Sequence, residues 1–368
     1  MNLIKALLNE RLSNETAEFQ LTELRASLTP NSDPALLEAM GVFCFHHEYV
    51  LAGEREADGL LDSCYRPIPS PIPGADRLNH VQYYEPQIEA GLVPVILSTP
   101  DTPVRAQYEE NPYPRWWGDL QAIPSPNDKS KKLIAGCGTG RQAIIQALSA
   151  PESGIVALDL SRRSLQFAMR EAQDRGVTNV QWVQGDILDL CDLGQRFDQI
   201  QCAGVLHHMP SPGTGLTALA DVLEDGGSIK VSVYTQRSID DLGPGREIAR
   251  NYPPTPEGIR AFRQEIFRFP TTHPARDLTT RAEFYTVSEC RDLVFHVQEQ
   301  GFTFQKLGEL ADSAGLQIEW VYAVADAASL FRERFPEATG VEMEKWADLE
   351  TTHPHLFGRM HQIVLGCR

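Results

Sequence analysis

Residues 132–141 read KLIAGCGTGR, a short β-rich run that leads directly into a glycine-rich turn. Gly136, Gly138 and Gly140 carry no Cβ atom, so the backbone of this turn can approach a ligand closely. The next run, RQAIIQALS, is helical in pattern, and a helix N-terminus offers N–H donors and the positive end of a dipole. The stretch therefore predicts a strand–turn–helix unit that suits a nucleotide-like ligand, although a tight turn without a ligand fits the same residues.

The segments that follow alternate between strand-like and helix-like patterns. GIVALDL is followed by SRRSLQFAMREAQDRG, and NVQWVQGD and FDQIQCAG come next. This alternation predicts a parallel sheet wrapped by helices. LQIEWVYAV and HQIVLGCR, near the end of the chain, also read as strands, so we expect the sheet to be completed only at the C-terminus.

Composition narrows the class of protein. The 368 residues carry a net charge of −17, which disfavours a nucleic-acid backbone as the partner. The sequence contains no run of about 18 apolar residues, so we expect no membrane span. The first residues are too polar for a signal peptide. The seven cysteines are scattered without a CxxC pair, which favours free thiols in the cytoplasm and offers no zinc site. We therefore predict no metal.

Two carboxylates follow the next two predicted strands. Asp159 lies nineteen residues after Gly140, where a carboxylate can accept both hydroxyls of a ribose. Asp186 is placed to meet the exocyclic amine of an adenine. Either Asp alone is commonly a strand-end or helix-capping residue. The glycine turn, Asp159 and Asp186 in this order at strand ends are a more specific sign of a nucleoside site. The dinucleotide pattern GxGxxG requires glycine where Arg141 stands, which disfavours a nicotinamide oxidoreductase.

IAGCGTG, ALDLS, QGDILDL, AGVLHHM and LEDGGSIKVSV resemble, in this order, the motifs of class I S-adenosylmethionine-dependent methyltransferases. The resemblance covers about residues 130–235. It implies S-adenosylmethionine as cofactor, S-adenosylhomocysteine as product, and an α/β fold with a Rossmann-like, doubly wound sheet of seven strands. The cofactor-binding residues that it implies are Gly136, Cys137, Gly138, Gly140, Asp159, Leu160, Asp186 and Ile187. Ile134 stands where the family often has an acid.

The same resemblance gives a domain organisation. We expect an N-terminal helical region at 1–100, a connecting loop at 101–130 and the methyltransferase domain at 131–368. Within that domain, residues 236–300 interrupt the alternation after the fifth predicted strand. The family carries its acceptor cap at this position, so we expect a helical cap there.

The connecting loop contains QYEENPYPRWW at 107–117, which is also similar to a bacterial methyltransferase subgroup. Its prolines exclude a regular helix. A cationic methyl donor is attracted to aromatic faces, so we hypothesise that the loop forms a lid over donor and acceptor. The lid candidates are Tyr108, Asn111, Arg115 and Trp116 for acceptor binding and Tyr113 for catalysis. The alternative is an aromatic belt that packs the helices together, a role that suits Trp117.

Three further residues are candidates for catalysis. His207, in the pair His207–His208 after the fourth predicted strand, could act as a general base, or the pair could shape the pocket. Asp292 and His296 are spaced i, i+4, so the carboxylate could orient the histidine as a base, or the two could form an ordinary helix contact.

The resemblance predicts an enzyme that methylates a small-molecule or peptide acceptor in the cytoplasm of a bacterium. We expect no nucleic-acid or membrane partner, and the N-terminal helices offer a homodimer contact. A different class remains open, namely a regulatory or scaffolding protein that binds the donor or its product without catalysis.

Overall fold

The computed structural model describes residues 3–368; Met1 and Asn2, which begin the predicted helical region, lie outside the described residues. The chain divides into two compact units, each assembled from three segments. We call them the helical unit (1–92, 111–120 and 242–296) and the sheet unit (93–110, 121–241 and 297–368).

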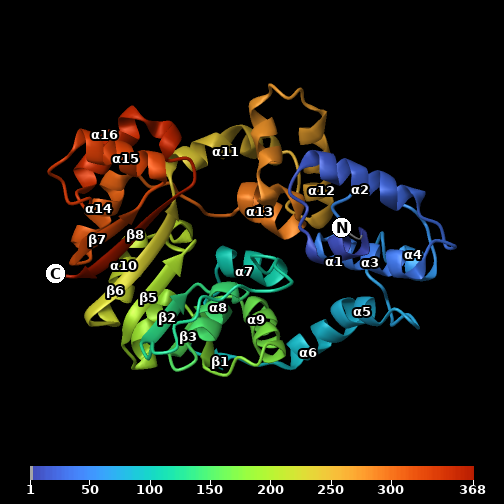
Figure 1. Ribbon diagram of the computed structural model, residues 1–368, viewed down its shortest axis with the longest axis horizontal. Coiled ribbons are helices and arrows are strands. Elements are labelled where there is room, and N and C mark those ends of the chain that lie inside the picture. The colour runs from blue at the N-terminus through green and yellow to red at the C-terminus, as the bar shows by residue number, and fades with distance from the viewer. Residues whose placement is uncertain (1–2) are drawn as a thin grey trace. The chain divides into compact units, whose positions relative to one another are not determined.

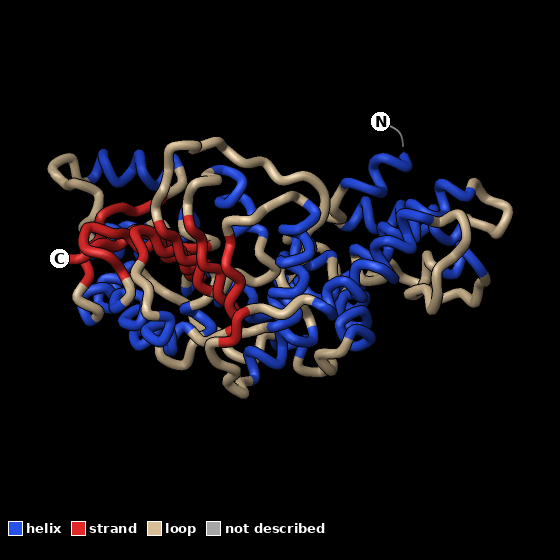
Figure 2. Tube along the Cα trace, turned by 90° about the horizontal axis from the view of Figure 1, so that it is seen from below, coloured by secondary structure: helices blue, strands red, loops and turns tan. Residues whose placement is uncertain are grey.

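One mixed sheet forms the centre of the sheet unit, with strand order β1-β4-β3-β2-β5-β6-β8-β7 (Figures 1 and 2). Strands β1 to β6 run parallel, and β8 pairs antiparallel with both β6 and β7. The strands are β1 (Val95–Ile96), β2 (Lys131–Ala135), β3 (Gly154–Asp159), β4 (Val180–Gln184), β5 (Phe197–Ala203), β6 (Leu223–Tyr234), β7 (Leu316–Tyr322) and β8 (Met360–Cys367). The expected α/β class and the late completion of the sheet are confirmed.

The sheet has eight strands, one more than the seven that the family resemblance implies. The additional strand is Val95–Ile96, which pairs with Val183 and Gln184 at the edge of the sheet. Two residues are too few to show an alternating pattern, and both side chains are exposed. Nothing in the local sequence therefore separates this edge strand from the loop around it.

Helices of the sheet unit pack on the strands according to the alternation of side chains along each strand. Leu133 and Ala135 of β2 belong to the main buried cluster with Leu216 of α10 and Leu307 of α14. Ile134 points to the other face. The helices and helical turns of this unit are α7 (Pro103–Glu110), α8 (Arg141–Ser149), α9 (Arg162–Asp174), η2 (Ile187–Leu193), η3 (Leu206–His208), α10 (Pro212–Asp221), α14 (Phe304–Ser313), α15 (Ala325–Arg334), α16 (Met343–Thr352) and η6 (Pro354–Leu356).

The helical unit joins the start of the chain to most of the insertion after β6. Phe43 of α3 and Phe262 of α12 lie in one buried cluster. Asp33 caps α3 by accepting the N–H of Ala35 at 3.0 Å, and Pro34 stands at the start of this helix. The helices are α1 (Leu3–Asn9), α2 (Glu15–Ser27), α3 (Pro34–His46), α4 (Gly59–Asp62), α5 (Asp76–Asn79), η1 (His80–Tyr84), α6 (Glu85–Gly91), α12 (Pro256–Arg268), η4 (Pro274–Thr280), η5 (Ala282–Tyr285) and α13 (Val287–Phe295). The chain passes between the units within α11 (Gln236–Ala249).

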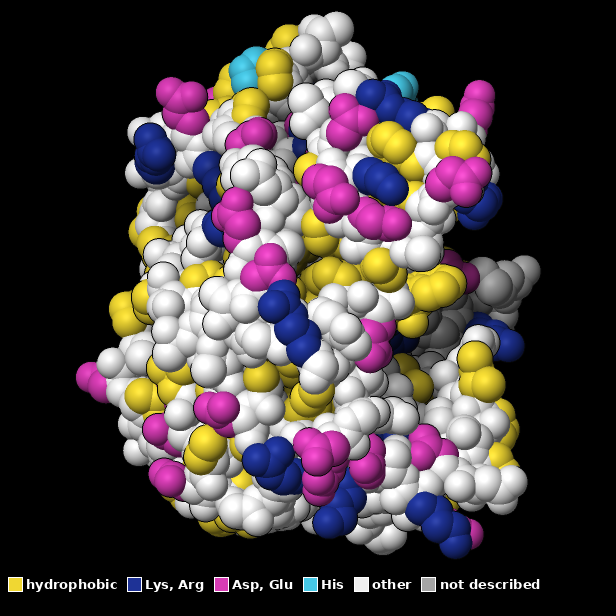
Figure 3. Space-filling view, turned by 90° about the vertical axis from the view of Figure 1, so that its left-hand side faces the viewer, with side chains coloured by type: hydrophobic (Ala, Val, Ile, Leu, Met, Phe, Trp, Pro, Cys, Tyr) yellow, Lys and Arg dark blue, Asp and Glu magenta, His cyan; other side chains and the backbone are white. Residues whose placement is uncertain are grey.

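Acidic and basic side chains are interspersed on the face that Figure 3 shows, and no single basic patch covers it. Within residues 3–368, no helix has both the length and the apolar character that crossing a bilayer requires. All seven cysteines are free thiols, and five of them are buried.

Candidate cofactor and acceptor site

The glycine-rich turn follows β2 directly and depends on left-handed backbone. Gly136, Gly138 and Gly140 have φ angles of 72°, 53° and 80°, a region that L-residues with a Cβ rarely adopt. The N–H groups of Gly136 and Cys137 both donate to the carbonyl of Leu158 in β3, at 2.8 and 2.9 Å. The turn is thereby held against the neighbouring strand.

Two of these glycines also lie too close to other groups to carry a side chain. A Cβ at Gly136 would come within 2.2 Å of Cγ2 of Val205, and one at Gly140 within 2.4 Å of the Cβ of Ala168. Gly140 is the N-cap of α8, so the first N–H groups of that helix face the turn without a capping side chain from this residue. Such a helix start suits a polar or anionic ligand group.

Asp159, at the end of β3, is tied to the turn. Its Oδ2 accepts the N–H of Gly138 at 2.7 Å, and its Oδ1 accepts the N–H of Ser161 at 2.9 Å. Burial away from water raises the pKa of this carboxyl to about 6, and the two N–H donors offset only part of that effect. Each oxygen has a further lone pair, so the carboxylate can accept hydroxyl groups of a ligand as well.

The end of β4 carries the second predicted pair. The Oδ1 of Asp186 accepts the N–H of Leu188 at 3.0 Å and caps η2, while its own N–H donates to Oγ of Ser98 at 2.9 Å. Ile187 lies in the main buried cluster. Leu160 is half-buried, and its carbonyl accepts from Nε2 of Gln184 at 3.3 Å. Asp159 and Asp186 therefore follow neighbouring strands at the same edge of the sheet.

A cavity of about 420 Å³ opens beside these strand ends. Its lining includes Gln184 of β4, Thr99, and the first residues of α9. Glu109 of α7 lies in the wall and caps α9, because its carboxylate accepts the N–H groups of Arg162 and Arg163 at 2.7 and 3.2 Å. The sequence patterns gave no indication of this cap, since 53 residues separate Glu109 from Arg162.

The 107–117 segment is divided between the two units, and the expectation that it contains no helix is wrong for residues 107–110, which end α7 before the first proline of the segment. Tyr108 belongs to α7, in the sheet unit, where its carbonyl accepts from Oγ of Ser161 at 3.0 Å. The Tyr108 ring lies 6.4 Å from the ring of His208, centroid to centroid. Of the lid candidates, Tyr108 is thus the one that the sheet unit places beside His208.

The remaining loop candidates lie in the helical unit. The guanidinium of Arg115 lies over the ring of Phe45, 5.6 Å from its centroid. Trp116 is buried, and Trp117 stacks on His46 at 4.7 Å. All of these contacts lie within the helical unit.

Two other helical-unit candidates complete the loop. Asn111 donates from Nδ2 to Oγ of Ser288 at 3.2 Å, and its Oδ1 accepts a hydrogen bond from Arg291. Tyr113 is half-buried in the same segment.

Asp292 and His296 lie together in the helical unit, at α13 and its C-cap. The Oδ1 of Asp292 lies 3.9 Å from Nε2 of His296, and both side chains are almost fully buried. For these two atoms the separation is within ion-pair range and longer than a hydrogen bond.

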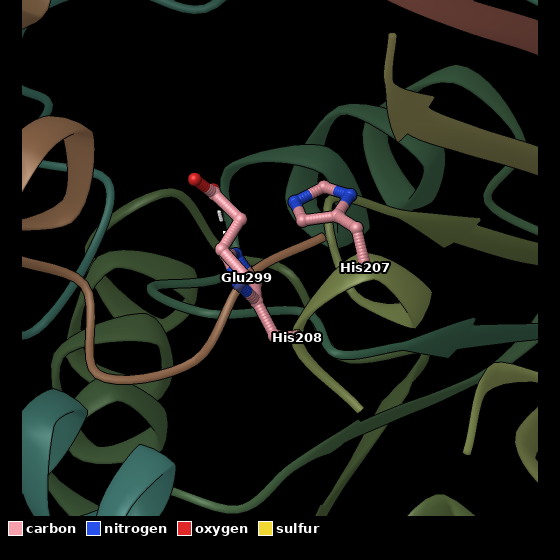
Figure 4. Close-up of side chains that lie close together, drawn as sticks. All are labelled: His207, His208 and Glu299. Atoms are coloured by element: carbon pink, nitrogen blue, oxygen red, sulfur yellow. Dashed lines mark ion pairs between the residues drawn. The ribbon is translucent and has the colours of Figure 1, made fainter. Parts of the chain in front are cut away.

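His207 and His208 follow β5 within η3, and both are buried. Glu299 points toward them from another segment of the sheet unit, with its side chain only 3% exposed (Figure 4). Its Oε1 lies 3.9 Å from Nδ1 of His208. Sequence reasoning missed Glu299, because 91 residues separate it from His208 and no local pattern links the two.

A family model described as "Methyltransferase domain" matches residues 127–247. The turn, both strand-end carboxylates and the histidine pair all lie inside this match. Residues 127–247 are therefore similar to methyltransferase domains, in agreement with the resemblance that the motifs indicate.

The individual relatives either have low sequence identity to this chain or match only a short part of it. An uncharacterized protein of Synechococcus sp. is 40% identical over 105 residues, which are 28% of this chain and 25% of that protein. The ubiquinone biosynthesis O-methyltransferase of Leptothrix cholodnii is 25% identical over 139 residues, 37% of this chain and 57% of that enzyme. The chain thus spans between a quarter and somewhat over half of the length of these relatives.

Among solved structures, PKMT2 from Rickettsia typhi in complex with AdoHcy superimposes with a TM-score of 0.52 at 18% identity. The superposition covers 75% of this chain and 55% of that one. At this identity the likeness concerns the fold alone.

Proposed function

We propose that the protein is an S-adenosylmethionine-dependent methyltransferase that releases S-adenosylhomocysteine. The observation that carries this proposal is the link between Asp159 and the left-handed glycine turn, within a segment that matches a methyltransferase domain. The link aligns a buried carboxylate with a turn of close-packed backbone, which is what a ribose and its neighbouring polar groups require.

The residues present fit this cofactor. Asp159 would accept ribose hydroxyls, since each of its oxygens retains a lone pair after accepting one N–H. Gly136, Gly138 and Gly140 would let the backbone approach the ligand, and Asp186 would meet the adenine amine. The Cβ positions at Gly136 and Gly140 are already filled by neighbouring groups, so any larger residue would deform the turn.

When bound, the sulfonium donor supplies an electrophilic methyl group for in-line displacement. The chain must then hold the acceptor in line and keep water away. Tyr108 lies beside His208 in the sheet unit and is suited to covering this edge. We propose the lid role for Tyr108. Asn111, Arg115 and Trp116 remain proposals for acceptor recognition, and Tyr113 remains a proposal for catalysis.

We further propose a small-molecule or peptide acceptor, rather than nucleic acid, because the net charge is −17. The similarity to an O-methyltransferase of ubiquinone biosynthesis makes oxygen acceptors the first class to screen. We also propose that the protein works in the bacterial cytoplasm. A homodimer through the N-terminal helices is consistent with Phe19 of α2, which is 63% exposed.

Calorimetric titration with S-adenosylmethionine and S-adenosylhomocysteine tests the cofactor. In Asp159→Asn, the amide oxygen can still accept one N–H, but its NH₂ group cannot accept the other. We expect micromolar binding to the unmodified chain and at least tenfold weaker binding to the variant, which corresponds to about 1.4 kcal/mol. Asp174→Asn, at the far end of α9, is the matched control and should bind normally. No heat from either nucleoside would exclude the cofactor assignment.

The alternative, a regulatory protein that binds without catalysis, requires a turnover measurement. Methyl transfer to a panel of phenols, carboxylates, amines and short peptides separates the two functions. Tyr113→Ala and His296→Ala should lower turnover in an enzyme while cofactor affinity stays within about twofold. Binding without transfer to any acceptor class would favour the regulatory alternative.

A further inference from the structure

The two adjacent histidines after β5 differ in what their Nδ1 atoms contact. Nδ1 of His207 lies 3.3 Å from the backbone nitrogen of Tyr234. Nδ1 of His208 lies 3.1 Å from the carbonyl oxygen of Gln298. An amide N–H can only donate, and a carbonyl oxygen can only accept. The two contacts therefore place opposite requirements on the two rings.

His207 must accept at Nδ1. In a neutral imidazole one nitrogen is an acceptor and the other carries the proton, so the proton of His207 lies on Nε2. The ring is held in place by the ring of Tyr234, 4.5 Å away between centroids. The His207 carbonyl also accepts the N–H of Gln300 at 3.0 Å. At Nε2, His207 is therefore a hydrogen-bond donor and cannot accept a proton there.

His208 has the reverse arrangement. Its Nδ1 carries the proton that the Gln298 carbonyl accepts, so in the neutral ring the lone pair lies on Nε2. The contact is reciprocal, because Nε2 of Gln298 donates to the His208 carbonyl at 2.7 Å. Nε2 of Gln300 also donates to the carbonyl of Met209 at 3.0 Å. Residues 298–300 are thus bonded along 207–209, which fixes the orientation of the His208 ring.

Both histidines follow β5, which pairs with β2, the strand that leads into the glycine turn where the methyl donor would bind. Val205, two residues before His207, occupies the space that a Cβ at Gly136 would need. We infer that His208 is the general base of the reaction and that His207 is a hydrogen-bond donor to the acceptor. This inference rests on the proposed methyltransferase function and replaces His207 by His208 as the proton acceptor.

As the acceptor oxygen or nitrogen forms its bond to the methyl carbon, the carbon–sulfur bond breaks and its electron pair stays on sulfur, which becomes a neutral thioether. Nε2 of His208 takes the proton of the acceptor. The ring then becomes an imidazolium, and the Glu299 carboxylate at 3.9 Å from Nδ1 stabilises that positive charge.

A bound metal ion is the competing explanation for these three side chains. His207, His208 and Glu299 each place one possible ligand atom within 4.8 Å of the others (Figure 4). A metal ligand must be deprotonated at the binding atom. Both ring nitrogens of neutral His207 are committed, Nδ1 to the N–H of Tyr234 and Nε2 to the proton, so a metal bound to His207 would have to break the Tyr234 contact. We therefore favour proton transfer.

Nuclear magnetic resonance tests the tautomers without an acceptor. The full chain, labelled with ¹⁵N-histidine and saturated with S-adenosylhomocysteine, gives long-range ¹H–¹⁵N correlations that distinguish protonated from unprotonated ring nitrogens. His207→Gln and His208→Gln assign the signals. We expect an unprotonated Nδ1 in His207 and an unprotonated Nε2 in His208. Matching tautomers in the two rings would overturn the inference, as would loss of both patterns on adding one equivalent of Zn²⁺. Calorimetry on the same sample reports separately whether the nucleoside binds.

Turnover with the acceptor panel provides the catalytic readout. His208→Gln should lower kcat by about a hundredfold or more, with unchanged affinity for S-adenosylhomocysteine. His207→Gln keeps an N–H donor and should lower kcat less than tenfold. A larger loss in His207→Gln than in His208→Gln would contradict the assignment. If no acceptor on the panel is methylated, the tautomer pattern alone decides.

Discussion

The carboxylate of Asp159 accepts the backbone N–H of Gly138 at 2.7 Å, so the end of β3 holds the turn that follows β2. A side chain that is expected to bind a ribose thus also shapes the backbone around the cofactor. Substituting Asp159 should change both cofactor binding and the free energy of unfolding. The pH dependence of unfolding measures the second effect by itself.

The first prediction concerns the pH dependence that Asp159 confers on stability. Its folded-state pKa of about 6 lies above the ordinary 3.8, so the folded chain holds this proton more tightly than the unfolded chain. Stability from this group is therefore fully present below about pH 4 and is lost as pH rises through 6. Between pH 4.5 and 7.5, the free energy of unfolding should fall by about 2 kcal/mol relative to Asp159→Asn.

Urea denaturation of both proteins at the two pH values measures this difference, and the variant cancels the contribution of every other titrating group. If the difference in the free energy of unfolding between the two proteins is the same at both pH values, the pKa of the Asp159 carboxyl is not raised in the folded state.

The cofactor turn and the two strand-end carboxylates could be predicted because the signals are local. Strand, glycines and helix follow one another within twenty residues, and Asp159 and Asp186 come directly after strand-like runs. Local patterns could not predict which distant segments of the chain assemble into the helical unit. Arg263 and Glu18 form a buried ion pair across 245 residues, and no local pattern records such a partner.

The histidine pair illustrates the same limit at the site. AGVLHHM identifies the position of His207 and His208 but not their proton positions, which depend on Tyr234 and on the Gln298 carbonyl. That carbonyl lies 90 residues further along the chain. The motif therefore locates a candidate base, whereas the tertiary hydrogen bonds distinguish which histidine can accept a proton.

The second prediction separates backbone strain from steric clash in the turn. Gly140 and Gly176 both have positive φ, 80° and 67°. A Cβ at Gly140 would meet Ala168 at 2.4 Å, whereas nothing lies within 4 Å of one at Gly176. Gly176→Ala should cost about 1 kcal/mol from strain alone, and Gly140→Ala about 1–3 kcal/mol more from overpacking. Thermal or urea unfolding of the two variants measures the difference.

Gly140→Ala should also weaken S-adenosylhomocysteine binding at least tenfold, while Gly176→Ala leaves it unchanged. Equal stability losses in the two variants would mean that Ala168 and its neighbours move aside without cost.

The third prediction concerns the cap that α7 provides for α9. Glu109 accepts the N–H groups of Arg162 and Arg163, so Glu109→Ala removes both bonds and should cost about 1 kcal/mol of stability. Amide hydrogen exchange at Arg162 and Arg163 should accelerate as well. Glu152→Ala is the control, because Glu152 pairs with Lys129 on the surface with both side chains mostly exposed, and such pairs contribute little. A loss no greater than that of the control would show that the cap is not formed.

The fourth prediction concerns the buried ion pair of the helical unit. Arg263 is fully buried, donates to the carbonyls of Phe284 and Val50 at 2.6 and 3.1 Å, and pairs with Glu18. Arg263→Met leaves the Glu18 carboxylate buried without its cation, which should cost about 3–5 kcal/mol. Arg268→Met, at an exposed pair with Glu265, should cost less than about 1 kcal/mol.

The pH dependence of the same variant distinguishes lost charge pairing from lost packing. Burial already raises the pKa of Glu18, and Arg263 lowers it, so removing Arg263 should raise it further. A raised folded-state pKa gives stability at low pH that is lost as pH rises, so Arg263→Met should be less destabilised at pH 5 than at pH 7.5. Adding Glu18→Gln should remove that pH dependence and recover part of the stability at pH 7.5. A destabilisation that is equal at both pH values would assign the effect of Arg263 to its packing and backbone hydrogen bonds instead.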